Sequence, residues 1–179
     1  MPPDPALFAR NIAGKVVLVT GAGGSIGSEL CRQIASQRPS KLVLLDHSEF
    51  ALYTINHELR ETWRGLPISA CLGSSNDDGL VRALLRTQQV QTVYHAAAYK
   101  HVPIVESNMQ QGLRNNVFGS LTIARAALET GAETCVLIAG FVHVLLRGCA
   151  AALDVTSAAP CLRHPAPPSA FTRMRLHEC

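Results

Sequence analysis

A cluster of glycines between residues 20 and 27 has the residue types and spacing that most directly suggest chemistry in this sequence. Thr20, Gly21, Gly24 and Gly27 fit the pattern T-G-x-x-G-x-x-G. In such a turn the first glycine allows a sharp bend, the second lets a pyrophosphate approach the backbone, and the third lets a helix pack closely on a strand. The N–H groups at the helix start then face the phosphates. The pattern predicts a dinucleotide-binding turn, with a purely structural strand–helix turn as the alternative.

A carboxylate stands where a dinucleotide turn needs a ligand for a ribose. Asp46 ends the apolar run 41–46, nineteen residues after Gly27. A carboxylate at the end of the second strand accepts hydrogen bonds from the adenosine ribose and repels a 2′-phosphate. Arg38 precedes the run and is badly placed to hold a 2′-phosphate. The sequence therefore predicts NAD rather than NADP, and the alternative is that Asp46 only serves a turn.

Apolar runs alternate with amphipathic segments from residue 15 to about residue 139. Short apolar runs rich in β-branched residues are typical of strands covered on both faces, and helices of this length join parallel strands through right-handed crossovers. The sequence therefore predicts an α/β fold, a Rossmann-like doubly wound parallel sheet. The expected strands cover 15–20, 41–46, 68–72, 91–96 and 134–139; the expected helices cover 25–37, 49–63, a segment ending at 88, and about 109–130, with 102–108 as a connecting segment.

Capping residues and periodicity predict how these helices begin and which sides they bury. Ser48 is expected to cap the second helix, and Asn76 or Asp77 the third. Apolar residues that recur every three or four positions form one face of a helix and are expected to pack inward. These are Ile26, Leu30 and Ile34 in the first helix, and Phe50, Tyr53 and Leu59 in the second.

The regular pattern stops near residue 138, which divides the chain into three expected parts. They are an N-terminal extension (1–14), a Rossmann half-domain (15–138) and an atypical tail (139–179). The tail contains four arginines and no lysine, and its proline-rich stretch 160–168 fits neither a helix interior nor a central strand. We expect the tail to be disordered or foreign to the fold, as translation in a shifted frame or a rearrangement would make it.

Composition excludes several other classes of function. The net charge of +3 and the absence of any block of like charge argue against a nucleic-acid partner. The six cysteines form no C-x-x-C pair, so no metal site is expected and the thiols fit a reducing cytoplasm. The N-terminus has no apolar signal segment. The longest nearly unbroken apolar run, 136–146, is shorter than the roughly 18 residues that span a bilayer. We therefore expect a cytoplasmic protein with no membrane span.

Four segments resemble a single enzyme family: "GKVVLVTGAGGSIGSELCRQIA", "LVLLDHSEFALYTINHEL", "VYHAAAYKHVPIVE" and "NNVFGSLTIARAA". This family is the CapD-like polysaccharide-biosynthesis branch of the extended short-chain dehydrogenases/reductases. Its members are nucleotide-sugar 4,6-dehydratases, typically acting on UDP-N-acetylglucosamine, and related epimerases. The resemblance covers about residues 5–138 and implies an NAD cofactor and a nucleotide-sugar substrate. The N-terminal residues resemble the segment that follows a membrane anchor in the family, so we expect this chain to lack that anchor.

The resemblance also implies which residues contact the cofactor. In the family, the positions matching the glycine turn contact the phosphates, the position matching the carboxylate binds the adenosine ribose, and a paired alanine lines the cofactor. A lysine lies near cofactor and sugar, and an asparagine begins the N-V-x-G helix. The matching residues here are Gly21, Gly24, Ser25, Ile26 and Gly27 for the phosphates, Asp46 for the ribose, Ala96 and Ala97 for the lining, Lys100, and Asn116.

For several residues near the ends of the fourth strand and the long helix, a purely structural role is the alternative to a role in chemistry. A histidine at a strand end is expected to pack against its neighbours rather than to act in catalysis, and tyrosines without a nearby base are expected to pack as well. The charged pair after the strand would otherwise be a solvated loop, and the asparagine a helix cap. These residues are His95, Tyr94 and Tyr99, the pair Lys100 and His101, and Asn116.

The catalytic residues of the family are missing from this sequence. The family uses a Ser or Thr at the end of the fifth strand, a Tyr-x-x-x-Lys or Met-x-x-x-Lys pair, and a Thr-Asp-Lys segment. The last lysine here is Lys100, and none of these patterns occurs. We therefore expect no catalytic residue and a truncated, catalytically incompetent chain, with a non-catalytic NAD-binding module or regulator as the alternative. A sheet that stops after five strands would also expose an edge that favours pairing between copies.

Overall fold

The computed structural model describes residues 9–138 of the chain. The expected atypical tail, 139–179, lies outside the described residues, as do residues 1–8 of the expected N-terminal extension. The described part contains the segment in which strand and helix patterns are expected to alternate, except for the last residue of the expected strand 134–139.

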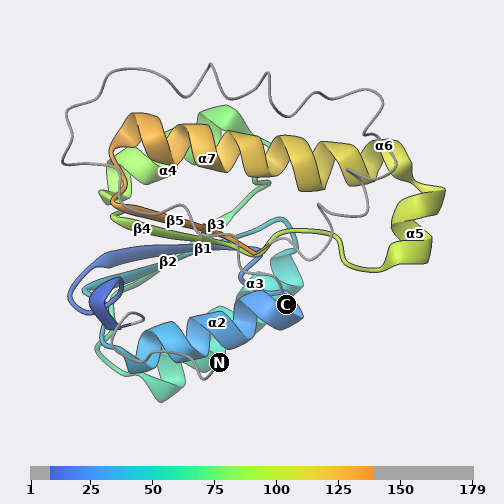
Figure 1. The fold of residues 1–179 in the computed structure, drawn as a ribbon. Helices are drawn as coiled ribbons and strands as arrows, with labels where there is room; N and C mark the ends of the chain where they lie inside the picture. Colours follow the sequence, from blue (N-terminus) through green and yellow to red (C-terminus); the bar gives the residue numbers. More distant parts are fainter. Residues whose placement is uncertain (1–8, 139–179) are drawn as a thin grey trace, which may run out of the picture.

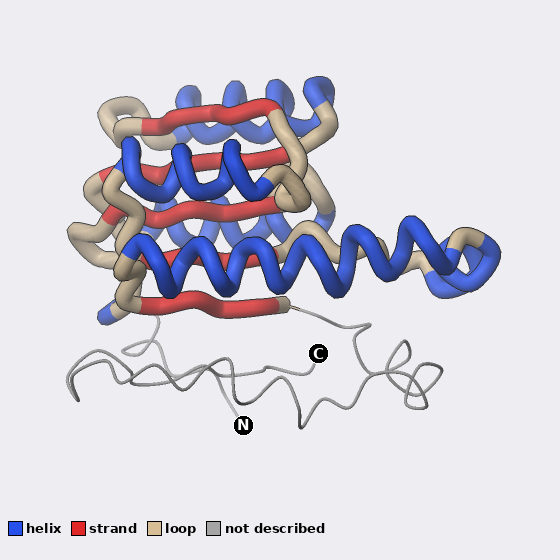
Figure 2. The backbone as a smooth tube through the Cα atoms, turned by 90° about the horizontal axis from the view of Figure 1, so that it is seen from above, coloured by secondary structure: helices blue, strands red, loops and turns tan. Residues whose placement is uncertain are grey.

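The described residues form a five-stranded sheet in which every strand pair is parallel. The spatial order is β3-β2-β1-β4-β5, so the order reverses between β1 and β4. Figure 2 shows the five strands lying side by side, with β5 at one edge. The strands are β1 (Val16–Thr20), β2 (Lys41–Asp46), β3 (Ile68–Leu72), β4 (Thr92–His95) and β5 (Thr134–Leu137).

Helices cover both faces of the sheet, as the doubly wound prediction requires (Figure 1). On one face lie α2 (Ser25–Ser36) and α3 (Glu49–Thr62), and on the other lie α4 (Asp78–Gln88) and α7 (Gly119–Thr130). The Rossmann-like fold is thereby confirmed. The cause is visible along β1, where Val17 and Val19 belong to one apolar cluster and Leu18 belongs to the other. A strand that is apolar at every position has to be covered on both faces.

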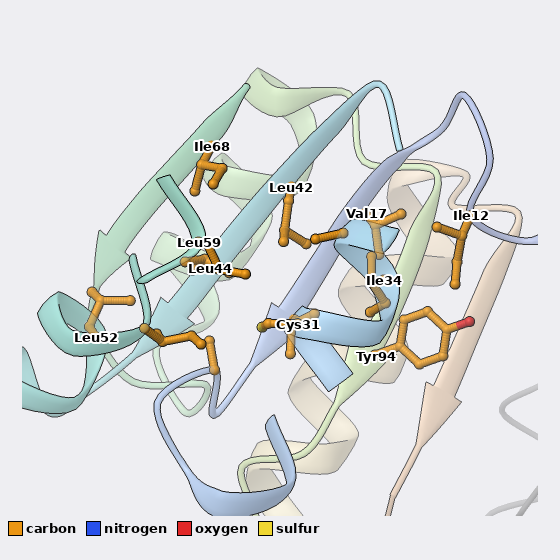
Figure 3. Packing of buried hydrophobic residues seen from close by; sticks show 14 residues of the cluster. Ile12, Val17, Cys31, Ile34, Leu42, Leu44, Leu52, Leu59, Ile68 and Tyr94 are labelled. Carbon is orange, nitrogen blue, oxygen red and sulfur yellow. The ribbon is translucent and has the colours of Figure 1, made fainter. Parts of the chain in front are cut away.

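The cluster under α2 and α3 is the larger of the two apolar cores (Figure 3). It brings strand side chains against two helices, and its members are almost completely inaccessible to solvent. Burial of this kind contributes roughly 25 cal/mol for each Å² of apolar surface removed from water. Its labelled members include Val17, Leu42, Leu44 and Tyr94 from the sheet, Cys31 and Ile34 from α2, and Leu52 and Leu59 from α3.

The inward faces of α2 and α3 differ from the periodicity-based expectation. Ile26 is 44% exposed, Phe50 80% and Tyr53 63%, so these three predictions were wrong. The buried positions are Gly27, Cys31, Ile34 and Ala35 in α2, and Leu52, Ile55 and Leu59 in α3. The buried face of α2 is set by the residue at which the helix comes closest to the sheet. This residue is Gly27 and not the larger Ile26. In α3 the buried stripe starts two residues after Phe50, which is about 200° around the helix axis.

The predicted caps are confirmed for two helices. The Ser48 hydroxyl accepts a hydrogen bond from the Ala51 N–H at 3.4 Å, and the Asp77 carboxylate accepts one from the Leu80 N–H at 3.0 Å. Of the two candidates for the third helix, Asp77 is therefore the cap. Ser48 and Asp77 both follow strands at the carboxyl edge of the sheet, so these caps fix the start of two helices beside the same edge.

The expected helix over 109–130 is a continuous helical run with an irregular middle. It consists of α6 (Met109–Gly112), a π-helical segment η1 (Leu113–Phe118) and α7, and it ends at Gly131 in the left-handed conformation. The segment expected to connect β4 to this run is itself helical in part, as α5 (Val102–Ser107). That expectation was wrong because Pro103 lies in the first turn of α5, where the missing N–H of proline costs no helical hydrogen bond.

Two glycines allow β1, β4 and α2 to meet. Gly21 has φ +68°, and a Cβ there would lie 2.6 Å from the Ala96 carbonyl oxygen. A Cβ on Gly27 would lie 1.9 Å from the Gly21 carbonyl oxygen. Neither neighbour is a flexible side chain that can move aside, so both positions require glycine.

Among the described residues, no helix is both long enough and apolar enough to span a bilayer.

We expect Gly27→Ala to lower the free energy of unfolding by at least about 2 kcal/mol, because the new methyl group meets backbone and forces α2 away from β1. Gly79→Ala is the matched control, since Gly79 also lies in a helix but its Cβ would meet nothing closer than the Asp77 Oδ1 atom at 3.5 Å. The control should be neutral or stabilising by up to about 1 kcal/mol. Urea denaturation measures both, and equal stabilities for the two variants would contradict the close-packing account.

Candidate functional site

A pocket opens at the carboxyl ends of the strands, where the strand order reverses between β1 and β4. In open α/β sheets this is the place where ligands bind. The pocket collects residues from the turn after every strand except β5, which explains why residues far apart in sequence share it. Its lining consists of Thr20, Gly21, Gly23, Gly24, Leu45, Asp46, His47, Ser48, Ala51, Gly73, Ser74, Ser75, Ala96, Ala97, Ala98, Tyr99 and Asn115.

The pocket borders the start of α2, where Gly24 lines it. Gly24 is the N-cap residue and makes no side-chain cap hydrogen bond. The first i to i−4 hydrogen bond of the helix runs from the Ser28 N–H to the Gly24 carbonyl at 2.8 Å. The N–H groups of residues 25–27 precede that bond and, as in any first helical turn, have no intrahelical acceptor. Together with the positive end of the helix dipole, they make a site suited to an anion such as a phosphate.

Asp46 ties two loops of the pocket together. Its Oδ2 atom accepts a hydrogen bond from the Gly23 N–H at 2.8 Å, and its Oδ1 atom accepts one from the Ser48 N–H at 2.9 Å. The residue is nearly buried, yet it lines the pocket. The carboxylate therefore serves the turn, as the alternative interpretation held, and also faces the space where a ligand would lie.

Two consecutive asparagines of η1 bind the backbone of residues 97–99, which form the pocket wall opposite the glycine loop. The Asn116 side chain accepts a hydrogen bond from the Tyr99 N–H at 2.8 Å and donates one to the Tyr99 carbonyl at 3.0 Å. The Asn115 side chain donates to the Ala97 carbonyl at 2.7 Å. The interpretation of Asn116 as a helix cap was wrong, because this residue is inside the helical run and 1% exposed. It acts on the backbone of the wall, while Asn115 lines the pocket itself.

Lys100 reaches from the loop after β4 to the first residue of α2. Its Nζ atom donates to the Ser25 Oγ atom at 3.0 Å, which brings an ammonium group to the helix start beside the glycine loop. Lys100 is therefore more than one half of a solvated loop pair. His101 is exposed and is the N-cap residue of α5, without a side-chain cap bond.

His95 is buried behind the pocket and is 1% exposed. Its Nδ1 atom lies 2.6 Å from the Thr20 Oγ1 atom, and its Nε2 atom lies 3.1 Å from the Ser120 Oγ atom. Burial lowers the pKa of His95 to about 4, so the imidazole is neutral at physiological pH. The expected packing role of His95 agrees with this geometry. Tyr94 is likewise buried in the core, where burial raises its pKa to about 12, whereas Tyr99 is partly exposed at the pocket.

The structure brings together most of the residues that the sequence singled out. Gly21, Gly24, Asp46, Ala96 and Ala97 all line the pocket. Ser25, Ile26, Gly27, Lys100 and Asn116 do not line it: the first three form the first turn of α2 directly after Gly24, Lys100 contacts Ser25, and Asn116 is hydrogen-bonded to the backbone of Tyr99.

Sequence reasoning missed the contribution of the turn after β3 and of the start of α3. The signal was present, because these residues directly follow predicted strands and the carboxyl ends of parallel strands meet at one edge. Nothing in the sequence distinguishes Asn115 from its neighbour Asn116, although only Asn115 lines the pocket. The missed lining residues include Gly73, Ser74 and Ser75, His47, Ser48 and Ala51, and Asn115.

No group of three or more His, Cys, Asp or Glu side chains within residues 9–138 is placed to hold a metal ion. The described cysteines Cys31, Cys71 and Cys135 are free thiols. Burial raises the pKa of Cys31 to about 12 and that of Cys135 to about 11, so both thiols stay protonated at physiological pH.

Comparison with known proteins finds matches among polysaccharide biosynthesis proteins. Residues 17–140 match the family described as polysaccharide biosynthesis protein. Over 136 residues the chain is 40% identical to the probable polysaccharide biosynthesis protein EpsC of Bacillus subtilis and 38% identical to the capsular polysaccharide biosynthesis protein CapD of Staphylococcus aureus. Each alignment covers 75% of this chain and 23% of the relative. The chain therefore spans about a quarter of the length of these two curated relatives.

A solved structure shares both the fold and part of the sequence. It is the dTDP-glucose 4,6-dehydratase DesIV of Streptomyces venezuelae, solved with NAD and TYD bound. The TM-score is 0.58 and the sequence identity 27%, over 68% of this chain and 38% of that enzyme.

We expect the free energy of unfolding to fall by up to about 1.4 kcal/mol per pH unit on account of His95 as the pH drops from about 6.5 to about 4. In this window the unfolded chain binds a proton at residue 95 and the folded chain does not, so acid favours unfolding. Below about pH 4 both states are protonated and this contribution to the slope ends. Urea denaturation across this pH range measures the slope. His95→Gln should flatten it, whereas the exposed control His57→Gln should not; identical slopes for all three proteins would contradict the buried neutral imidazole.

Proposed function

Because this chain belongs to the polysaccharide biosynthesis protein family, we propose that residues 15–138 are the cofactor-binding part of a nucleotide-sugar 4,6-dehydratase or epimerase and that the pocket binds NAD. One observation carries the proposal: a glycine loop opening onto a helix N-terminus and a buried carboxylate on the neighbouring strand line the same pocket at the point where the strand order reverses. A dinucleotide needs these two features at this spacing, one for its phosphates and one for its adenosine ribose.

The geometry of the glycine loop fits a pyrophosphate. A Cβ built on Gly24 would meet only the Gly21 carbonyl oxygen, at 3.2 Å, so the space beside Gly24 belongs to the pocket. Gly24 and the first-turn residues Ser25, Ile26 and Gly27 would hold the phosphates through backbone N–H groups. Lys100, whose ammonium group already lies at Ser25, would add a positive charge to the same place.

Asp46 fits the ribose of NAD better than that of NADP. Each carboxylate oxygen accepts one backbone hydrogen bond, and because such an oxygen has about two lone pairs, each can also accept from a ribose hydroxyl. A 2′-phosphate at this point would meet a negative charge. No lysine or arginine of the described segment lines the pocket to offset that repulsion. Ala96 and Ala97 would leave room for the cofactor against the wall.

Bound NAD would supply hydride acceptance from C4 of a nucleotide sugar, of the UDP-N-acetylglucosamine type that the family resemblance implies. The residues of this chain would bind and orient the cofactor: the glycine turn holds its phosphates, Asp46 its ribose, and Asn116 fixes the wall that faces it. The sequence contains no Tyr-x-x-x-Lys or Met-x-x-x-Lys pair to take the proton from the C4 hydroxyl. We therefore propose that the chain by itself binds the cofactor without turning over the sugar.

We expect calorimetry to show binding of NAD to the full 179-residue chain, with NADP at least about tenfold weaker because of Asp46. Gly24→Ala should weaken NAD binding by at least about tenfold, since its methyl group occupies the space of the phosphates. Gly79→Ala is the matched control, because Gly79 does not line the pocket, and it should bind NAD like the unaltered chain. Absence of binding at millimolar NAD, or equal affinities for NAD and NADP, would overturn this assignment.

We also expect no 4-keto sugar when the chain is incubated with NAD and UDP-N-acetylglucosamine, since the sequence contains no Tyr-x-x-x-Lys or Met-x-x-x-Lys pair to act as the base for the C4 hydroxyl. Proton NMR of the reaction mixture detects the 4-keto-6-deoxy product directly. Product formed at a rate proportional to the concentration of this chain would show that the missing residue pair is replaced by another base.

A further inference from the structure

A chain of buried polar groups runs behind the pocket from the end of β1 to the π-helical segment. The Thr20 hydroxyl lies 2.6 Å from the His95 Nδ1 atom, and the His95 Nε2 atom lies 3.1 Å from the Ser120 hydroxyl. Ser120 in turn donates to the Asn116 carbonyl at 2.6 Å. All four residues are less than 10% exposed. Buried polar groups in such a chain have to be satisfied together, because a single unpaired member costs about 1–3 kcal/mol.

The direction of every hydrogen bond in this four-residue network follows from one carbonyl group. The Asn116 carbonyl can only accept, so the single proton of the Ser120 hydroxyl points to it. The Ser120 oxygen must then accept from His95, which places the proton of the neutral imidazole on Nε2. The Nδ1 atom is left as an acceptor, and Thr20 donates to it. The tautomer of His95 is therefore fixed by its surroundings.

Both ends of this hydrogen-bonded network reach the pocket. Thr20 lines the pocket directly and precedes Gly21, the first glycine of the phosphate turn. At the other end, the backbone of Asn116 receives the Ser120 hydrogen bond while its side chain holds the N–H and carbonyl groups of Tyr99. The imidazole itself does not line the pocket. His95 thus connects the glycine turn to the opposite wall from behind.

The π-helical register is what allows this connection. The Gly119 N–H donates to the Arg114 carbonyl, five residues back, which is the hydrogen bond of a π-helix. In this register the side chains of Asn115 and Asn116 both reach the wall, at Ala97 and Tyr99, while Ser120 reaches His95. π-Helical turns inside longer helices occur frequently at functional sites.

We propose that His95 is a positioning residue: with its proton on Nε2, it fixes Ser120 and Asn116 and so holds the pocket wall 97–99 in the geometry that receives the cofactor, without touching the cofactor. The proposal rests on the proposed binding of NAD in this pocket. Replacement of the imidazole by an apolar side chain leaves the Thr20 hydroxyl without an acceptor and removes the bond that ties Ser120, and through it Asn116, to the end of β4.

Whether the pocket wall, residues 97–99, is held in place can be measured without any ligand. The Tyr99 N–H is bonded to the Asn116 side chain, so its hydrogen exchange reports whether the wall is held. In His95→Leu and in Ser120→Ala we expect this exchange to be at least about tenfold faster. Leu85→Ala is the control: Leu85 is buried in the cluster on the α4 side of the sheet and does not line the pocket. It should destabilise the protein to a similar extent without a selective effect at Tyr99.

NAD affinity tests the functional part of the proposal on the same variants of the full chain. We expect His95→Leu and Ser120→Ala each to weaken NAD binding by about tenfold. The double variant should bind no more weakly than the poorer single variant, because either substitution already interrupts the same hydrogen-bonded network. If His95→Leu does not fold, Ser120→Ala alone decides the outcome. Unchanged NAD affinity and unchanged Tyr99 exchange in Ser120→Ala would overturn the proposal.

The ¹⁵N spectrum of the imidazole distinguishes this proposal from the binding assignment. The account expects one protonated nitrogen, Nε2, at neutral pH, and a proton on Nδ1 would overturn it. If the unaltered chain does not bind NAD at all, the proposed function fails and the functional part of this proposal fails with it. The tautomer and the Tyr99 exchange would still show whether His95 holds the wall.

Discussion

The structure depends on a close approach of backbone at the carboxyl end of β1. A Cβ at residue 27 would fall 1.9 Å from the Gly21 carbonyl oxygen, and a Cβ at residue 21 would fall 2.6 Å from the Ala96 carbonyl oxygen. Glycine at both positions lets α2, β1 and the turn after β4 meet at one point. That meeting point sets the inward face of α2 and places the first turn of the helix next to Gly24, which lines the pocket.

Polar side chains hold the pocket in shape around that point. Asp46 binds the Gly23 and Ser48 N–H groups, so one carboxylate fixes both the glycine loop and the start of α3. Asn115 and Asn116 fix the facing wall by three hydrogen bonds to its backbone. The loops of this pocket are therefore largely preorganised, which reduces the entropy lost when a ligand binds.

Much of the fold follows from the sequence alone, because the apolar runs and the helix caps are local signals. The five strands, the caps Ser48 and Asp77, and the end of the long helix at Gly131 are all in the predicted places. The glycine turn and Asp46 also meet at one pocket as predicted. Ile26 was misplaced because the close approach at Gly27 sets the inward face of α2, and Phe50 and Tyr53 were misplaced because the buried stripe of α3 runs through Leu52, Ile55 and Leu59 instead. The π-helical segment was not predicted, because the sequence indicated one helix over about 109–130, and it is from this segment that Asn115 and Asn116 bond to residues 97–99.

The central claim is that NAD lies across the carboxyl edge of the sheet, with its phosphates on the glycine turn. Backbone ¹H–¹⁵N spectra of the full chain, recorded during titration with NAD, test it most directly. The account predicts that the largest shifts fall on the amides of 21–27, 46–48, 73–75 and 96–99, which form the pocket. The amides of Arg38, Ser40 and residues 89–91, which precede the amino ends of β2 and β4, should change little. Spectra that do not change at millimolar NAD, or shifts concentrated away from the pocket, would contradict the claim.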